Sequence, residues 1–182
     1  MSLAGALLIK LMEQYLTLAY RLTLLEVQKL AYFLQESGEP LELRYESGHY
    51  GPFAANLNKV LDRIEGHFIR GYGDSQKPDV EIGVLNGAAQ LADALLTSHA
   101  DSRARLQRVA RLIDGFETPY GMELLSSVHW VAKHGSGVGN ADEAIQAVHA
   151  WNDRKKQMFS DAHIRVAWSQ LAGEGWVKET SA

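Results

Sequence analysis

Helix start and stop signals recur along almost the whole chain, and they restrict it to a mainly helical fold. Thr23 and Glu26 form a capping-box pattern, in which each side chain can satisfy an exposed backbone N–H group of the other residue. An apolar stripe follows, and Gly38 with Pro40 ends the helix, because glycine tolerates the left-handed cap and proline cannot continue the helix. Further start signals stand at Asn86, for a helix through Leu95, at Asp101, for a helix through Ile113, and at Thr118-Pro119, Asn140 and Ser160.

Short extended segments separate these helices. The segment "VEIGVL" (80–85) alternates apolar and polar side chains and predicts a half-buried strand. Pro52 is expected at the first position of a helix whose apolar face runs to Phe68. Near the end, helices followed by a strand in "GEGWVKE" (173–179) resemble a winged helix-turn-helix. The fold class predicted is mainly α with short β elements, a compact multi-helix domain with a winged-helix-like C-terminal half.

The length of 182 residues suits one domain, which we expect to span 1–182. Within it we expect an N-terminal docking helix in 1–22, a first lobe in 23–102 and a helical, winged-helix-like lobe in 103–182. The segment 3–20 is rich in apolar residues, but Lys10, Glu13 and Gln14 interrupt it, so it predicts an amphipathic helix and no membrane span. The chain has no cysteine, which fits a reducing, cytoplasmic compartment.

The search for catalytic and metal-binding motifs finds no constellation. His129 and His134 are five residues apart, which places them on different helix faces, and the sequence has no HExxH motif. The serines lack a G-x-S-x-G elbow, and "GSGVGN" (135–140) lacks the Lys-Ser/Thr ending of a phosphate-binding loop. We therefore predict no catalytic residues, no metal and no cofactor, with an enzyme of unrecognised site as the weakest alternative.

Nucleic-acid binding is the main alternative function, because the C-terminal half resembles a helix-turn-helix. The expected recognition helix, "SDAHIRVAWSQLAG" (160–173), offers Arg165 against Asp161. Further cations stand before this helix and at helical spacing elsewhere: Arg154, Lys155, Lys156, Arg105, Arg108 and Arg111. Duplex binding needs several cations along one face, and the formal charge of the chain is −4. The sequence does not favour nucleic-acid binding, and a winged-helix transcriptional regulator stays the alternative.

Two long motifs resemble a known family. They are "LTLLEVQKLAYFLQESGEPL" (22–41) and "GHYGPFAANLNKVLDRIEGHFIRGYG" (48–73). Together they resemble the C-terminal domain of DarG, the antitoxin that counters the DNA ADP-ribosyltransferase toxin DarT. More distantly, Val27-Gln28-Lys29-Leu30 and Tyr50-Gly51-Pro52 resemble motifs of Panacea (SocA-like) antitoxin domains. The resemblance runs from about Leu7 to Val177.

This resemblance implies a bacterial antitoxin module whose partner is a DarT-like toxin. DarG proteins place a macrodomain, which removes ADP-ribose from thymidine bases, ahead of this region, and we expect no macrodomain in the present chain. The family mechanism implies that antitoxin carboxylates cover the DNA-binding surface of the toxin, a form of DNA mimicry. A basic groove for single-stranded DNA would be complementary to such an array. The toxin-binding candidates are Glu36, Glu39, Glu42, Glu46, His49, Tyr50, Asp62, Glu65, Asp74, Asp79 and Glu81.

The segment "GHYGPF" (48–53) has two main interpretations, with a catalytic loop as the third and weakest. In the first it is a rigid packing corner, where Tyr50 buries its ring and hydrogen-bonds its hydroxyl group. In the second, His49 and Tyr50 belong to the toxin-facing surface.

Overall fold

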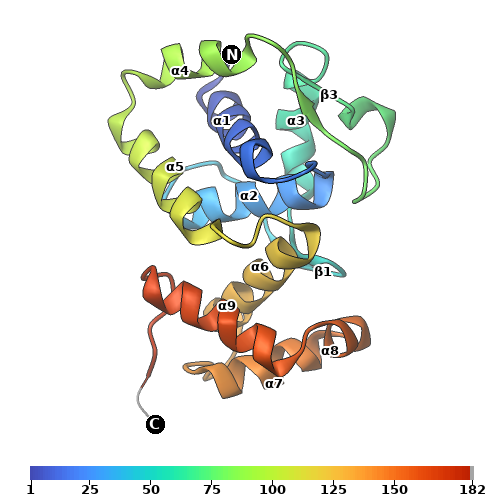
Figure 1. Cartoon of the computed structure of the whole chain (residues 1–182), viewed down its shortest axis with the longest axis vertical. Helices are drawn as coiled ribbons and strands as arrows, with labels where there is room; N and C mark the ends of the chain where they lie inside the picture. The colour runs from blue at the N-terminus through green and yellow to red at the C-terminus, as the bar shows by residue number, and fades with distance from the viewer. Residues whose placement is uncertain (181–182) are drawn as a thin grey trace.

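Two groups of helices follow one another along the chain and lie one above the other in Figure 1. The computed structural model describes residues 1–180, except for the side chain of Asp74. The first group comprises α1 (Leu3–Leu18), α2 (Leu24–Glu36), α3 (Asn58–Ile64), α4 (Ala88–Leu96) and α5 (Ala100–Ile113). The second group comprises α6 (Pro119–His134), α7 (Ala141–Trp151), α8 (Asp153–Met158) and α9 (Asp161–Gly173). The mainly helical class is therefore confirmed.

Short two-stranded antiparallel sheets supply the β elements. β1 (Glu46–Gly48) pairs with β2 (Gly51–Phe53), and β3 (Ile69–Arg70) pairs with β4 (Gly83–Val84). β4 lies inside the segment that the alternating pattern predicts as a strand. Two 3-10 turns complete the connections: η1 (Ala55–Leu57) and η2 (Tyr72–Asp74).

Helix α1 forms the centre of the first group, where α2, α3, α4 and α5 all pack against it (Figure 1). Its apolar side chains repeat at helical spacing, and Leu8, Leu11, Met12 and Tyr15 are fully buried. Leu18, at its last position, is 70% exposed. The amphipathic segment at the N-terminus thus contributes core residues. Within residues 1–180, no helix is long and apolar enough to cross a membrane.

The predicted capping box is present at the start of α2, and its glutamate also accepts a hydrogen bond from a residue of α1. The buried carboxylate of Glu26 accepts from the Thr23 backbone N–H at 3.1 Å and from the Thr23 hydroxyl at 2.7 Å. The hydroxyl of Tyr15 in α1 donates to the other oxygen of the same carboxylate. One buried acid therefore joins the first two helices. Three of the other predicted start signals are confirmed, because Thr118, Asn140 and Ser160 each cap their helix. The caps predicted at Asn86 and Asp101 are wrong: the N-cap of α4 is Gly87, whose backbone is left-handed, and the N-cap of α5 is His99.

The prediction that Pro52 opens a helix is wrong, because residues 51–53 form a strand of a hairpin. Directly after this strand, the side chain of Gln28 binds both backbone groups of Ala54, accepting from its N–H at 3.1 Å and donating to its carbonyl at 3.0 Å. This two-sided contact holds the backbone extended (ψ 109°), so helical turns begin only at Ala55. A contact over 26 residues therefore overrides the local helix signal.

The winged-helix prediction for the C-terminal half is also not fulfilled, because no β-strand occurs in residues 103–180. After α9 the N–H of Trp176 donates to Leu171 O at 2.8 Å, which turns the chain back onto the helices. The indole ring of Trp176 then packs edge-on against Phe33 and under the guanidinium of Arg108. Trp176 and Val177 pack against the core, and the N–H of Thr180 donates to Gly139 O at 2.8 Å in the loop before α7, so residues 176–180 form no strand. α5 also runs without a break across the predicted lobe boundary at 102/103.

Replacing Glu26 by alanine should lower the free energy of unfolding by about 2–4 kcal/mol, because three buried donors lose their acceptor. Glu26→Gln, which keeps an acceptor oxygen, should lose less. Urea unfolding followed by circular dichroism measures both values. The exposed Asp114→Ala serves as the control, and equal losses for Glu26→Ala and this control would contradict the prediction.

Candidate functional site at the hairpin and the buried charge cluster

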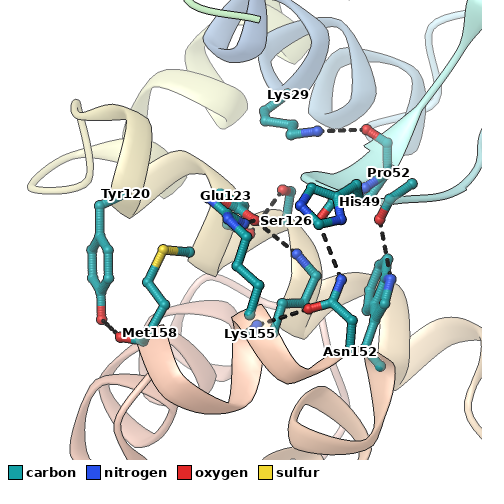
Figure 2. A network of polar contacts seen from close by, with 12 residues as sticks. Lys29, His49, Pro52, Tyr120, Glu123, Ser126, Asn152, Lys155 and Met158 are labelled. Atoms are coloured by element: carbon teal, nitrogen blue, oxygen red, sulfur yellow. Dashed lines mark hydrogen bonds and ion pairs between the residues drawn. The ribbon is translucent and has the colours of Figure 1, made fainter.

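The tip of the β1–β2 hairpin is anchored to the junction between α7 and α8. Trp151 donates its indole N–H to Gly48 O at 3.1 Å, and the amide of Asn152 donates to His49 O at 3.3 Å (Figure 2). The guanidinium of Arg154 lies 4.7 Å from the centre of the Tyr50 ring, a cation–π contact. The second group of helices therefore fixes a loop that belongs to the first half of the chain.

A buried cluster of charged residues lies next to the residues that anchor the hairpin. Glu123 of α6 is 2% exposed, and its carboxylate accepts from Arg154 at 2.5 and 3.1 Å and from Lys155 at 2.8 Å. Lys155 is completely buried. Burial alone would raise the pKa of Glu123, but the hydrogen bonds and charges of Arg154 and Lys155 outweigh it and hold this pKa below its usual value. The three residues therefore act as one charged unit.

Lys29 of α2 brings a second buried ammonium group to the other side of the hairpin. Its Nζ donates to Pro52 O at 2.7 Å, as Figure 2 shows. Burial lowers the pKa of Lys29 to about 7, although the charge of Glu123 acts in the opposite direction. A carbonyl oxygen stabilises an ammonium less than a carboxylate does, so this group is close to losing its charge.

Gly51 allows the hairpin to lie this close to α2 and α6. Its φ of +98° favours glycine, and a Cβ atom there would lie 3.0 Å from Ser127 Oγ and 3.5 Å from Lys29 Nζ. The hydroxyl of Ser127 is fully buried and has no hydrogen-bond partner within residues 1–180. The backbone of the hairpin therefore contacts polar interior groups directly.

Between the hairpin, the start of α2 and the loop before β4 lies a cavity of about 210 Å³, which we call the hairpin pocket. Its walls come from three stretches of chain: Leu24, Leu25, Gln28 and Lys29; Gly48, His49, Tyr50, Gly51 and Phe53; Gln76 and Pro78.

The predicted toxin-binding acids fall into two classes. Three have partners inside the molecule: Glu36 pairs with Lys133 at 2.7 Å, and buried Glu39 accepts from Ser102 at 3.0 Å and Arg105 at 2.8 Å. Half-buried Glu65 accepts the Gly71 N–H at 3.1 Å. The structure leaves five others exposed: Glu42, Glu46, Asp62, Asp79 and Glu81. The side chain of Asp74 lies outside the described part of the chain.

His49 and Tyr50 lie at the turn of the hairpin, and both are exposed. The ring of Tyr50 is 38% exposed, and its hydroxyl makes no hydrogen bond within residues 1–180. The expectation of a buried Tyr50 with a bonded hydroxyl is therefore wrong. The corner is rigid, but its aromatic side chains face outward.

Sequence reasoning missed the residues that hold the hairpin. In the sequence, Arg154 and Lys155 stand out only as cations for the less favoured alternative of DNA binding, whereas the structure directs them to Glu123. The available signal was a glutamate inside the apolar run "MELLSSV" (122–128) and a lysine inside the apolar stripe of α2. Isolated charges on a buried face require partners elsewhere in the fold.

The arginines considered for DNA binding also have protein partners. Arg105 pairs with Glu39, Arg165 pairs with Asp142, and Arg111 lies 3.8 Å from Glu174. These contacts reduce the positive charge available to phosphates.

No group of three His, Asp or Glu side chains within the described residues is placed to hold a metal ion. Burial lowers the pKa of His129 to about 4, and its Nδ1 lies 2.7 Å from the Tyr32 hydroxyl. His134 instead stacks on Trp130, with ring centres 3.8 Å apart. The two histidines thus have separate environments.

Comparison with known proteins finds relatives over most of the chain. No protein-family model matches it. The DNA ADP-ribosyl glycohydrolase of Thermus aquaticus is 40% identical over 172 residues, which cover 94% of this chain and 47% of that protein. The enzymes of the same name from Mycobacterium bovis and Mycobacterium tuberculosis are 37% identical over 153 residues, covering 81% of this chain and 43% of each relative. The chain is homologous to part of the DNA ADP-ribosyl glycohydrolases. It spans less than half the length of these relatives.

Removing the central carboxylate of the charge cluster should destabilise the protein strongly. Glu123→Ala leaves Lys155 buried without a counter-charge, and breaking such a buried pair lowers the free energy of unfolding by about 3–5 kcal/mol. Glu36→Ala breaks the Lys133 pair, whose lysine is 49% exposed, and should lose only about 0–1 kcal/mol. Chemical denaturation of both variants tests this, and a loss below about 1 kcal/mol for Glu123→Ala would contradict the role of the cluster.

Lys29 should make stability depend on pH in the alkaline range. The pKa of this amine is about 7 in the folded protein and about 10.5 in an unfolded chain, so the unfolded chain binds more protons between these values. The free energy of unfolding should therefore rise with pH across this window. Lys29→Met should remove that part of the slope, while exposed Lys59→Met should retain it. Urea midpoints measured from about pH 7 to about pH 10 test the difference, and parallel pH profiles for wild type and Lys29→Met would refute it.

Proposed function

We propose that this chain is the toxin-binding module of a DarG-type antitoxin, which neutralises a DarT-type DNA ADP-ribosyltransferase by direct binding and occlusion of its DNA site. The observation that carries the proposal is the homology to DNA ADP-ribosyl glycohydrolases, which extends over 94% of the chain for the Thermus aquaticus protein. That homology agrees with the DarG resemblance of the motifs in 22–41 and 48–73. The cognate partner is then the toxin itself.

We assign binding, and not hydrolysis, to this part of the antitoxin. The DarG resemblance places the removal of ADP-ribose from DNA in a macrodomain, a separate domain of the full-length antitoxin. In the present chain the buried charged side chains Lys29 and Glu123 are engaged in contacts that hold the fold together. Incubation of the chain with ADP-ribosylated single-stranded DNA should therefore release no ADP-ribose.

The mechanism we propose is local DNA mimicry on the exposed face formed by the hairpin and its neighbours. A protein that binds single-stranded DNA offers a basic groove for phosphates and platforms for stacked bases. The exposed carboxylates of Glu42, Glu46 and Asp79 would take the place of phosphates, and the exposed rings of His49 and Tyr50 would take the place of bases. Because the formal charge is only −4, the attraction must come from this patch and not from the whole molecule.

Internal ion pairs reduce the number of acids whose negative charge is available to the toxin. Glu36 and Glu39 already face Lys133 and Arg105, so their negative charge is compensated within the chain. We therefore propose the exposed class of acids as the toxin-facing charges and assign a structural role to the paired class.

Co-expression with the cognate toxin tests the proposed function directly. The chain should restore growth and should elute together with a catalytically inactive toxin variant in size-exclusion chromatography. Absence of both a complex and growth rescue would refute the proposal.

Charge reversal at the exposed acids should slow toxin association. A Glu42→Lys/Glu46→Lys double variant should reduce the association rate about tenfold or more at low salt, because charges at the rim of an interface act mainly on the encounter. Asp114→Lys, at an exposed carboxylate outside the candidate set, is the matched control and should associate at nearly the wild-type rate. Stopped-flow measurements at several salt concentrations test this, and equal rates for both variants would exclude the exposed acids as the contact.

A further inference from the structure

We propose that a pocket lined by α5, α6 and the tail after α9 binds the phosphate group of a small molecule. This pocket, which we call the tail pocket, has a volume of about 310 Å³. The residues on its wall that carry the argument are Glu36, Arg108, His129, Lys133, Trp176 and Lys178. The tail pocket shares no residue with the hairpin pocket, and this inference is independent of the proposed toxin binding.

His129 supplies a hydrogen-bond donor without an acceptor in the described fold. The residue is 6% exposed, and burial lowers its pKa to about 4, so the imidazole is neutral at neutral pH. The buried Tyr32 hydroxyl lies 2.7 Å from Nδ1 and has no other acceptor within residues 1–180, so it donates to Nδ1. The proton of the imidazole ring is then on Nε2, which makes no hydrogen bond within residues 1–180 and lies on a ring that lines the tail pocket.

Arg108 offers a charged donor edge to the same pocket. Its guanidinium carbon lies 4.4 Å from the centre of the Trp176 ring, so this contact occupies one face of the guanidinium and leaves the N–H edges available. One of these N–H groups donates to Gly175 O at 3.4 Å, a long contact. Arg105 and Arg111 of the same helix pair with glutamates, whereas no carboxylate pairs with Arg108 within residues 1–180. The remaining N–H groups can bind the oxygens of an anion.

The formal charges around the pocket balance, so the hydrogen bonds that remain open determine what it binds. Three cations line it: Arg108, Lys133 and Lys178. Three carboxylates lie on or beside its wall: Glu36, Glu143 and Glu179. Each carboxylate already accepts a hydrogen bond, from Lys133 at 2.7 Å, from the Gly139 N–H at 2.6 Å and from the Trp168 indole at 3.2 Å, respectively. Of the three cations, Arg108 and Lys178 have no carboxylate partner within residues 1–180, so the open groups are donors.

The arrangement of these donors selects a phosphate group. Arg108 belongs to α5, His129 to α6 and Lys178 to the tail, so the donors come from three separate elements. A tetrahedral phosphate presents oxygens in several directions, whereas a carboxylate presents two oxygens in one plane. Arginine is also well suited to bind two phosphate oxygens at once.

The size of the pocket and its surroundings favour a small molecule over a nucleic-acid strand. Small-molecule sites have volumes of roughly 300–1,000 Å³, and the tail pocket lies at the lower end of this range. A strand of DNA needs further free cations along one face. The neighbouring Arg105, Arg111 and Arg165 are instead paired with acids of the chain.

A titration with inorganic phosphate at constant ionic strength tests the site. The side-chain ¹⁵N signal of His129 Nε2 should shift until it saturates. Acetate and chloride at the same ionic strength should cause little change. Absence of a saturable shift would overturn the site, and an equal shift with acetate would overturn the assignment to phosphate.

Arg108→Gln should raise the dissociation constant for inorganic phosphate about tenfold or more, because it removes a charged donor from the pocket. Arg103→Gln, at an exposed arginine of the same helix outside the pocket lining, is the matched control and should change this constant less than about twofold. Equal effects of the two substitutions would show that phosphate binds to surface charge in general, which overturns the site. Lys178→Gln, at an exposed position, should also weaken binding and provides the test if Arg108→Gln does not fold.

Glu36→Gln should act in the opposite direction. It removes a negative charge from the pocket wall and releases Lys133 from its ion pair, so phosphate should bind about threefold more tightly or better. A variant that affected only the fold would not strengthen binding. Weaker or unchanged phosphate binding by a folded Glu36→Gln variant would therefore contradict the proposal.

Two further probes distinguish the source of the phosphate group. Ribose 5-phosphate should bind at least as tightly as inorganic phosphate and should lose affinity in Arg108→Gln. A short single-stranded DNA should bind more weakly than either. Tighter binding of the DNA, with a loss in Arg108→Gln, would overturn the assignment to a small molecule.

Discussion

The carboxylate of Glu123 lies between α6 and α8, and the position of the β1–β2 hairpin depends on it. By holding Arg154 and Lys155, it places the guanidinium of Arg154 over Tyr50 and orients the start of α8. That helix begins beside Trp151 and Asn152, which bind the hairpin carbonyls. A buried ion cluster of this kind contributes little net stability compared with apolar packing, but losing one member is strongly unfavourable. Its contacts therefore connect α6, the start of α8 and, through Arg154, the tip of the hairpin.

Local signals in the sequence predicted several helix starts correctly, because a cap is formed by residues three positions apart. Thr118, Asn140 and Ser160 cap their helices through neighbouring N–H groups, so no distant contact is needed. The larger errors of prediction occur where residues far apart in the sequence determine the backbone conformation. Gln28 holds Ala54 extended across 26 positions and prevents the helix expected from Pro52. Likewise, the tail after α9 folds back onto helices, so the sequence pattern of a wing does not become a strand.

The acids of the candidate site illustrate the same limit of local sequence reasoning. A list of acids can be read from a sequence, but their availability depends on partners that only the fold supplies. Glu39 resembles Glu42 in the sequence, yet it is buried against Ser102 and Arg105, whereas Glu42 is exposed. The cations of α5 illustrate the converse: a basic helix face predicts a phosphate-binding surface, but Arg105 and Arg108 contact the chain itself. Charge patterning therefore identifies candidate residues and leaves their partners undetermined.

The arrangement of the hairpin places acidic and apolar side chains on one short, anchored loop. In the proposed toxin complex, the acidic groups would attract a basic groove over some distance, but such attraction is weakened by salt and is poorly selective between basic proteins. Apolar contacts act only at short range and discriminate between partners by shape. Since the hairpin carries Glu46, Tyr50 and Phe53 within eight consecutive residues, a single rigid loop can supply both properties. The contacts of Glu123 with Arg154 and Lys155 help to hold these charged and apolar side chains in one fixed arrangement.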